Sequence, residues 1–75
     1  MGDLMKSTFK DRLNDALNYK NMKASELSRL SKVNEGAISQ YRKGRYKAKQ
    51  DTIEKLANAL NVSIPWLMGA DVPMQ

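Results

Sequence analysis

At 75 residues the chain is long enough for one small domain with a modest buried core. It has neither Cys nor His, which excludes disulfide bonds and thiolate metal sites and removes the usual general base, so we expect no catalytic site, metal or cofactor. Thirteen Lys and Arg against eight Asp and Glu give a net charge of +5, and no apolar run approaches a signal peptide or the ~20 residues of a membrane span, which predicts a soluble cytoplasmic protein.

The first predicted helix begins near Ser7. Residues 1–6 show no periodic pattern and are predicted to be disordered. From Ser7 onward one helical face becomes apolar, and the pattern fades near residues 18–21. Either Ser7 or Thr8 is suited to cap this helix. The apolar face consists of Phe9, Leu13, Ala16 and Leu17.

A second helix is predicted over residues 24–31. Leu27 and Leu30 form its expected buried side. Lys23 occupies the cap position, where its side chain offers no acceptor for the free backbone N–H groups. Glu26 stands where a capping-box acid would reach back to the cap, and Met22 could pack on Leu27 as a hydrophobic staple.

The third predicted helix begins after Asn34, a good N-cap, and ends before Gly44, which suits a left-handed stop. At 100° per residue its side chains divide into two groups. The inner group is Ala37, Ile38 and Tyr41. The outer group is Gly36, Ser39 and Lys43, flanked by Glu35, Gln40 and Arg42. One side of this helix is therefore expected to pack against the core, and the opposite side is free to contact a partner.

A basic block follows. Five cations lie within eight residues, with no acid among them: Arg42, Lys43, Arg45, Lys47 and Lys49. A local positive block of this kind attracts a polyanion. The alternative interpretation, a charged and merely solvated loop, fits the same residues.

Two further helices complete the pattern. One spans residues 50–60, and Asn61 is a plausible left-handed stop. Ser63 caps a last short helix, "IPWLM", which ends at Gly69. Residues 70–75, "ADVPMQ", are predicted to be a tail or the start of a linker.

Two short helices joined by a tight turn and followed by a basic loop are typical of a helix-turn-helix. The segment "ELSRLSKVNEGAISQYRKG" resembles that of the lambda-repressor-like family, which includes phage CI and Cro repressors and xenobiotic-response-element-type regulators. "LANALNVSIPWLMG" is similar to the end of the family's domain. The resemblance covers residues 7–69. It implies an all-α, compact five-helix bundle in which helices 2 and 3 form the helix-turn-helix and helix 3 enters the DNA major groove.

The resemblance also assigns binding residues. Base-reading positions would be Asn34, Glu35, Gly36, Ser39 and Gln40. Phosphate-binding positions would be Arg42, Lys43, Arg45, Lys47 and Lys49. Three positions depart from the family. Ser28 is a mild change, a small residue where Ala is usual. Ala24 stands where a phosphate-binding Gln is frequent, which leaves Lys23 or Ser25 to replace that contact. Lys32 stands where Gly is usual, and a positive φ there would strain it by about 1 kcal/mol.

The side chains at the base-reading positions have hydrogen-bonding groups that suit contacts with bases. Gln40 can bond adenine N6 and N7, and Glu35 can accept from cytosine N4, whereas Ser39 is less selective. Gly36 would allow close approach of the backbone to a base or phosphate. The same polar residues are equally compatible with a plain solvent-facing surface.

The resemblance implies a sequence-specific regulator of transcription that binds double-stranded DNA, most simply a phage-type repressor. It would act as a homodimer on an inverted repeat, without a membrane or small-molecule partner. "DVP" favours an N-terminal fragment of a CI-like repressor over a small Cro-like protein. The last helix supplies a possible dimer interface at Trp66, Leu67 and Met68, which are otherwise core residues. The alternative function is a protein-interaction module, such as an antitoxin or an adaptor.

Overall fold

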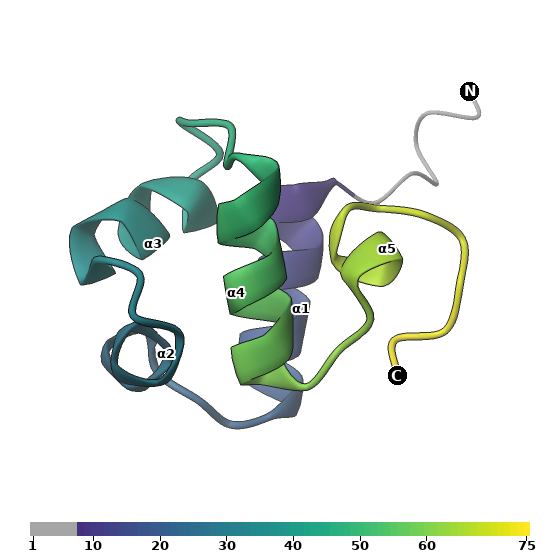
Figure 1. The fold of residues 1–75 in the computed structure, drawn as a ribbon, viewed down its shortest axis with the longest axis horizontal. Coiled ribbons are helices and arrows are strands. Elements are labelled where there is room, and N and C mark those ends of the chain that lie inside the picture. Colours follow the sequence, from purple (N-terminus) through teal and green to yellow (C-terminus); the bar gives the residue numbers. More distant parts are fainter. Residues whose placement is uncertain (1–7) are drawn as a thin grey trace.

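The computed structural model describes residues 8–75, and the predicted disordered segment 1–6 lies outside them. The described part of the chain forms five α-helices and no strand (Figure 1). They are α1 (Phe9–Tyr19), α2 (Ala24–Ser31), α3 (Glu35–Arg42), α4 (Gln50–Leu60) and α5 (Ile64–Leu67). The predicted all-α class and five-helix order are confirmed.

Side-chain caps define three of the helix starts. The Thr8 hydroxyl accepts from the Asp11 N–H, and the Asp11 carboxylate accepts in return from the Thr8 N–H, which completes a capping box. At α3, Asn34 Oδ1 accepts from the Ala37 N–H at 3.2 Å. At α5, the Ser63 hydroxyl accepts from the Trp66 N–H at 3.2 Å. The predicted caps therefore lie where the sequence expected them.

Residues with a left-handed backbone conformation follow four of the helices, close to where the sequence predicted these helices to end. Gly44 and Gly69 have φ values of 76° and 104° after α3 and α5. Asn61 has a φ of 58° after α4, and Lys32 has a φ of 66° after α2. Lys32 therefore has the positive φ on which the strain considered from the sequence depends.

Helices α1 and α4 lie at the centre of the fold (Figure 1). The pair α2 and α3 packs on one side, where α2 contacts α4 and α3 contacts α1. Helix α5 contacts both central helices on the other side. The largest fully buried side chains join all five helices in one core: Leu13, Leu17, Leu27, Ile38, Leu56, Leu60 and Leu67.

The prediction that Leu30 lies on the buried side of α2 is wrong. Leu30 is 48% exposed, whereas Ser31 is only 6% exposed. The buried edge of this helix runs through Leu27 and Ser31, four residues apart. The buried Ser31 hydroxyl has a hydrogen-bond partner, since it accepts from the Val33 N–H in the following turn at 3.2 Å.

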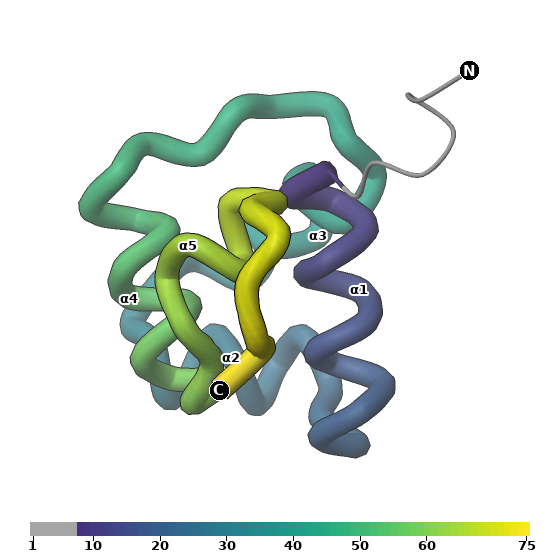
Figure 2. Tube along the Cα trace, turned by 90° about the vertical axis from the view of Figure 1, so that its right-hand side faces the viewer, coloured from purple at the N-terminus to yellow at the C-terminus, as the bar shows by residue number. Residues whose placement is uncertain are grey.

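The last six residues fold back along α5. The Ser63 N–H donates to the Met74 carbonyl at 2.6 Å, and the Ser63 hydroxyl donates to the Pro73 carbonyl at 3.0 Å. The Gln75 side chain donates to the Asn61 carbonyl at 3.0 Å. Figure 2 shows this segment in yellow beside α5. The stretch that the sequence assigned to a tail or linker is therefore attached to the domain.

Candidate nucleic-acid interface

The turn between α2 and α3 is held by two serines of α2. Ser28 donates its hydroxyl to the Val33 carbonyl at 2.6 Å, and Ser31 accepts from the Val33 N–H. Both backbone polar groups of one turn residue are thus satisfied by the preceding helix. Sequence reasoning treated Ser28 only as a small residue. The signal that could have revealed its function is the pair of Ser residues just before a turn, since Ser commonly bonds nearby backbone.

The five residues assigned to base reading gather at the beginning and on the outer face of α3. Glu35 and Gly36 are exposed, while Ser39 and Gln40 are partly exposed one turn further on. Asn34 is also exposed, but its side-chain oxygen is used in the cap. Only its amide nitrogen is left to donate to a partner.

The structure explains why position 36 of α3 is a glycine, which sequence reasoning did not. A Cβ placed on Gly36 would lie 2.9 Å from Asn34 Oδ1, the oxygen that caps the helix. Any larger residue at this position must push the cap aside. Gly36 therefore protects the start of α3, whether or not DNA approaches it.

The basic loop from residue 43 to residue 49 leaves the end of α3 and arches over the body of the fold before α4 begins (Figure 2). Its four cations, Lys43, Arg45, Lys47 and Lys49, are all exposed. Arg42 differs because it is partly buried against α1, where its Nε donates to Asn14 Oδ1 at 2.7 Å. Sequence reasoning did not identify Asn14, since nothing in the local pattern connects residues so far apart.

Two residues at the beginning of α2 present another polar surface. Lys23 and Ser25 are exposed, and the Lys23 side chain makes no capping bond. They line a shallow hollow of about 390 Å³ together with Glu26 and Arg29. No side chain caps the first N–H groups of this helix, and Lys23 lies directly before them.

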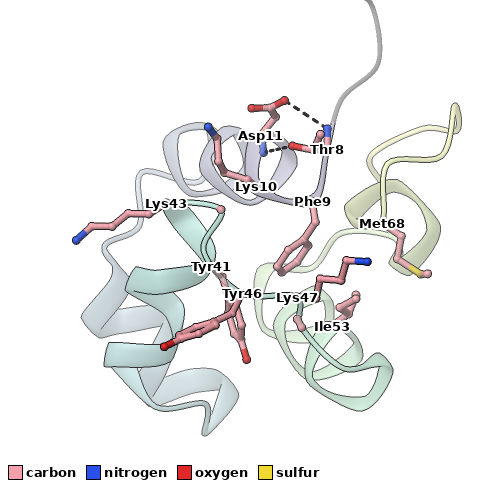
Figure 3. Close-up of a pocket in the computed structure, with 12 residues that line it drawn as sticks. Thr8, Phe9, Lys10, Asp11, Tyr41, Lys43, Tyr46, Lys47, Ile53 and Met68 are labelled. Carbon is pink, nitrogen blue, oxygen red and sulfur yellow. Dashed lines mark hydrogen bonds between the residues drawn. The ribbon is translucent and has the colours of Figure 1, made fainter. Parts of the chain in front are cut away.

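A wider groove lies between the start of α1, the basic loop and α4, where sequence reasoning saw no pocket (Figure 3). Its volume is about 820 Å³. Phe9 and Tyr41 form part of its wall and meet edge to face, with ring centroids 5.8 Å apart. Lys43 and Lys47 of the loop line it as well. The groove thus borders the basic loop.

The possible dimer residues of α5 have different positions. Leu67 is fully buried and Trp66 is 8% exposed, so these two side chains belong to the core. Met68 is 49% exposed. Of these three residues, only Met68 therefore has enough exposed surface to contact a partner.

Residues 8–75 hold neither a cluster of metal-ligating side chains nor a membrane-spanning helix. No group of three or more His, Cys, Asp or Glu side chains there is arranged to hold a metal ion. No helix in this range is both long and apolar enough to cross a membrane.

Two short helices around a tight turn, an exposed polar face on the second and a cationic loop after it define a helix-turn-helix domain. A family model described as helix-turn-helix matches residues 13–67, which is more than half of the chain. The chain belongs to this lambda-repressor-like family, and is accordingly a DNA-binding domain of the Cro/C1 type that acts in transcription regulation on double-stranded DNA. A comparison with curated proteins gives no match.

Proposed function

We propose that the chain is a sequence-specific transcriptional repressor of phage type, which binds its operator as a homodimer with α3 in the major groove. The observation that carries this proposal is the continuity of two surfaces. The exposed polar face of α3 leads directly into a loop with four exposed cations. A helix with these two features can read base edges while the loop meets the flanking phosphates.

Base reading is assigned to the outer face of α3. Gln40 bonds adenine through N6 and N7, and Glu35 accepts from cytosine N4. Asn34 donates through its amide, and Ser39 adds a less selective hydroxyl. Gly36 has no side chain, which allows the backbone at the helix start to approach a base or phosphate closely. A bidentate contact such as that of Gln40 contributes roughly 1–3 kcal/mol of discrimination against a wrong base.

Phosphate binding is assigned to two places. One is the end of α3 and the loop, with Arg42, Lys43, Arg45, Lys47 and Lys49. The other is the start of α2, where Lys23 and Ser25 adjoin the free backbone N–H groups. These contacts provide most of the affinity and the salt dependence, because bound cations release counterions from DNA.

A homodimer extends the surface across two half-sites. Such a dimer prefers an inverted repeat whose half-sites are centred about 34–36 Å apart. Met68 provides apolar surface for the contact between protomers, and Trp66 and Leu67 support it from within the core. Repression follows from occupying a promoter and requires no chemistry.

Selection from a randomised duplex pool tests this function. We expect enrichment of an inverted repeat, and we expect Gln40→Ala to relax one base position in each half-site. Asn58→Ala is the matched control, because Asn58 is an exposed amide on α4, outside the proposed surface. Unenriched sequence, recovered by a protein that still binds DNA at low salt, would contradict sequence-specific repression.

A further inference from the structure

We propose that the hollow between α1 and α3 seats one phosphodiester of the DNA backbone, and that Asn14 is the residue that positions its principal cation. The hollow is lined by Asn14, Ser39, Arg42 and Lys43 and has a volume of about 280 Å³. This inference rests on the proposed function and deepens it. It assigns a particular ligand group to a place that the sequence pattern does not reveal.

Arg42 is held in one orientation by two hydrogen bonds with Asn14. Arg42 Nε donates to Asn14 Oδ1 at 2.7 Å, and Asn14 Nδ2 donates to the Arg42 carbonyl at 3.0 Å. Asn14 Nδ2 is also bonded to the Lys10 carbonyl at 3.1 Å, which ties the amide to its own helix. Among the hydrogen bonds of residues 8–75, Arg42 uses only Nε of its guanidinium as a donor. The terminal N–H groups of the fork are left for phosphate oxygens.

Helix α3 ends at this hollow, and a helix C-terminus normally repels anions through its free carbonyls. Here the last four carbonyls all have donors. The Ser39 and Gln40 carbonyls accept from the Lys43 N–H, and the Tyr41 carbonyl accepts from the Gly44 N–H. The Arg42 carbonyl accepts from Asn14. Asn14 therefore both directs the cation and covers the last oxygen that would oppose a phosphate.

The remaining lining residues also suit an anion. Lys43 is exposed and adds a second positive charge, and Ser39 adds a hydroxyl. The hollow has no acidic lining residue. Ser39 lines this seat as well as the base-reading face, so Ser39→Ala should also weaken binding to a random-sequence duplex.

A double-mutant cycle with a random-sequence duplex tests the seat, because a backbone contact does not need an operator. Fluorescence anisotropy over a range of KCl concentrations gives the affinity and its salt slope. We expect Arg42→Gln to reduce the salt slope by about 1. We expect Asn14→Ala to weaken binding by about 3- to 10-fold in the parent chain. In the Arg42→Gln background the same change should have a clearly smaller effect, since only the cover of the backbone carbonyl is then lost.

Asn18→Ala is the matched control, since Asn18 is an exposed amide one turn further along α1, and it should bind as the parent chain does. Circular dichroism confirms that each variant is folded at the temperature used. If Asn14→Ala does not unfold but binds normally, or weakens binding equally in both backgrounds, the positioning of Arg42 is overturned. An unchanged salt slope in Arg42→Gln overturns the seat itself. Failure of the parent chain to bind any duplex overturns the proposed function together with this inference.

Discussion

Lys32 carries backbone strain in a turn that must bend sharply. Three residues other than Gly have positive φ in the described range, and two of them, Asn21 and Asn61, are of a type that tolerates this conformation. Lys32, at 66°, has a Cβ and a long side chain and lacks the local hydrogen bonding of Asn. Its N–H still closes α2 by donating to the Ser28 carbonyl at 2.9 Å. The turn therefore keeps its geometry against the preference of this residue.

Lys32→Gly should increase the free energy of unfolding by about 0.5–1 kcal/mol. Relief of the left-handed strain, roughly 1–2 kcal/mol, exceeds the extra flexibility that Gly gives the unfolded chain. Urea denaturation followed by circular dichroism measures the difference. Asn61→Gly is the control and should change stability less, because Asn already accepts its φ of 58°. A destabilised Lys32→Gly would show that the Lys side chain makes a stabilising contact.

At the scale of the elements, α2 fixes the angle at which α3 leaves the turn. The two Ser hydroxyls hold the N–H and the carbonyl of Val33, and Val33 itself packs against the core. Ile38 anchors the inner side of α3 with no exposed surface. The orientation of α3 is thus set by residues on its inner side, which face the protein.

Ser28→Ala should lower the free energy of unfolding by about 1–2 kcal/mol. The short 2.6 Å bond is lost and the partly buried Val33 carbonyl is left without its donor. Ser25→Ala, on the exposed side of the same helix, should change stability by less than about 0.5 kcal/mol. Urea denaturation of both variants provides the comparison. Equal stability of the two variants would mean that the turn is held by packing alone.

At the scale of the whole molecule, one side chain of α1 connects the first helix to the last. Arg12 Nη1 donates to the Trp66 carbonyl at 2.8 Å and to the Ala70 carbonyl at 3.3 Å. Its guanidinium carbon also lies 4.7 Å from the centre of the Trp66 ring. Helix α5 has only four residues, so it depends on such contacts more than on its own hydrogen bonds.

Arg12→Met should loosen α5 while keeping much of the apolar side-chain volume. The loss of the carbonyl bonds and of the cation–π contact should lower the free energy of unfolding by about 1–3 kcal/mol. Trp66 is the sole Trp of the chain, so its fluorescence reports on this region. We expect emission at longer wavelength and stronger quenching by acrylamide. Lys20→Met, at the far end of α1, should leave both signals unchanged, and a similar spectrum for the two variants would contradict the connection.

Local signals in the sequence predicted most of the fold. The boundaries of α2 and α4 followed from apolar spacing, and the ends of α3 from Asn34 and Gly44, because caps and stops act within a few residues. Long-range consequences were missed. The exposure of Leu30 depends on where α4 packs, since an eight-residue helix has too few positions to define its buried face.

The surface position of the candidate interface was predicted in part, and the contacts of its residues with DNA stay a prediction. The outer face of α3 and the cations after it lie on one continuous stretch of chain, so helical periodicity placed them. The bond between Asn14 and Arg42 joins residues 28 positions apart, and no local rule pairs an Asn with an Arg at that separation. The groove beside the basic loop likewise arises from four segments that meet only in the folded chain.

The residues that hold α3 in place differ from the residues proposed to read bases, and this difference has a consequence for evolution. Glu35 and Gln40 make no side-chain hydrogen bond within residues 8–75, and the contacts that fix α3 come from its inner edge and from the serines of α2. Exchanges at these two positions therefore leave the scaffold nearly intact. Under the proposed function, a descendant could acquire a new set of target genes through a few substitutions, without first finding compensating changes elsewhere.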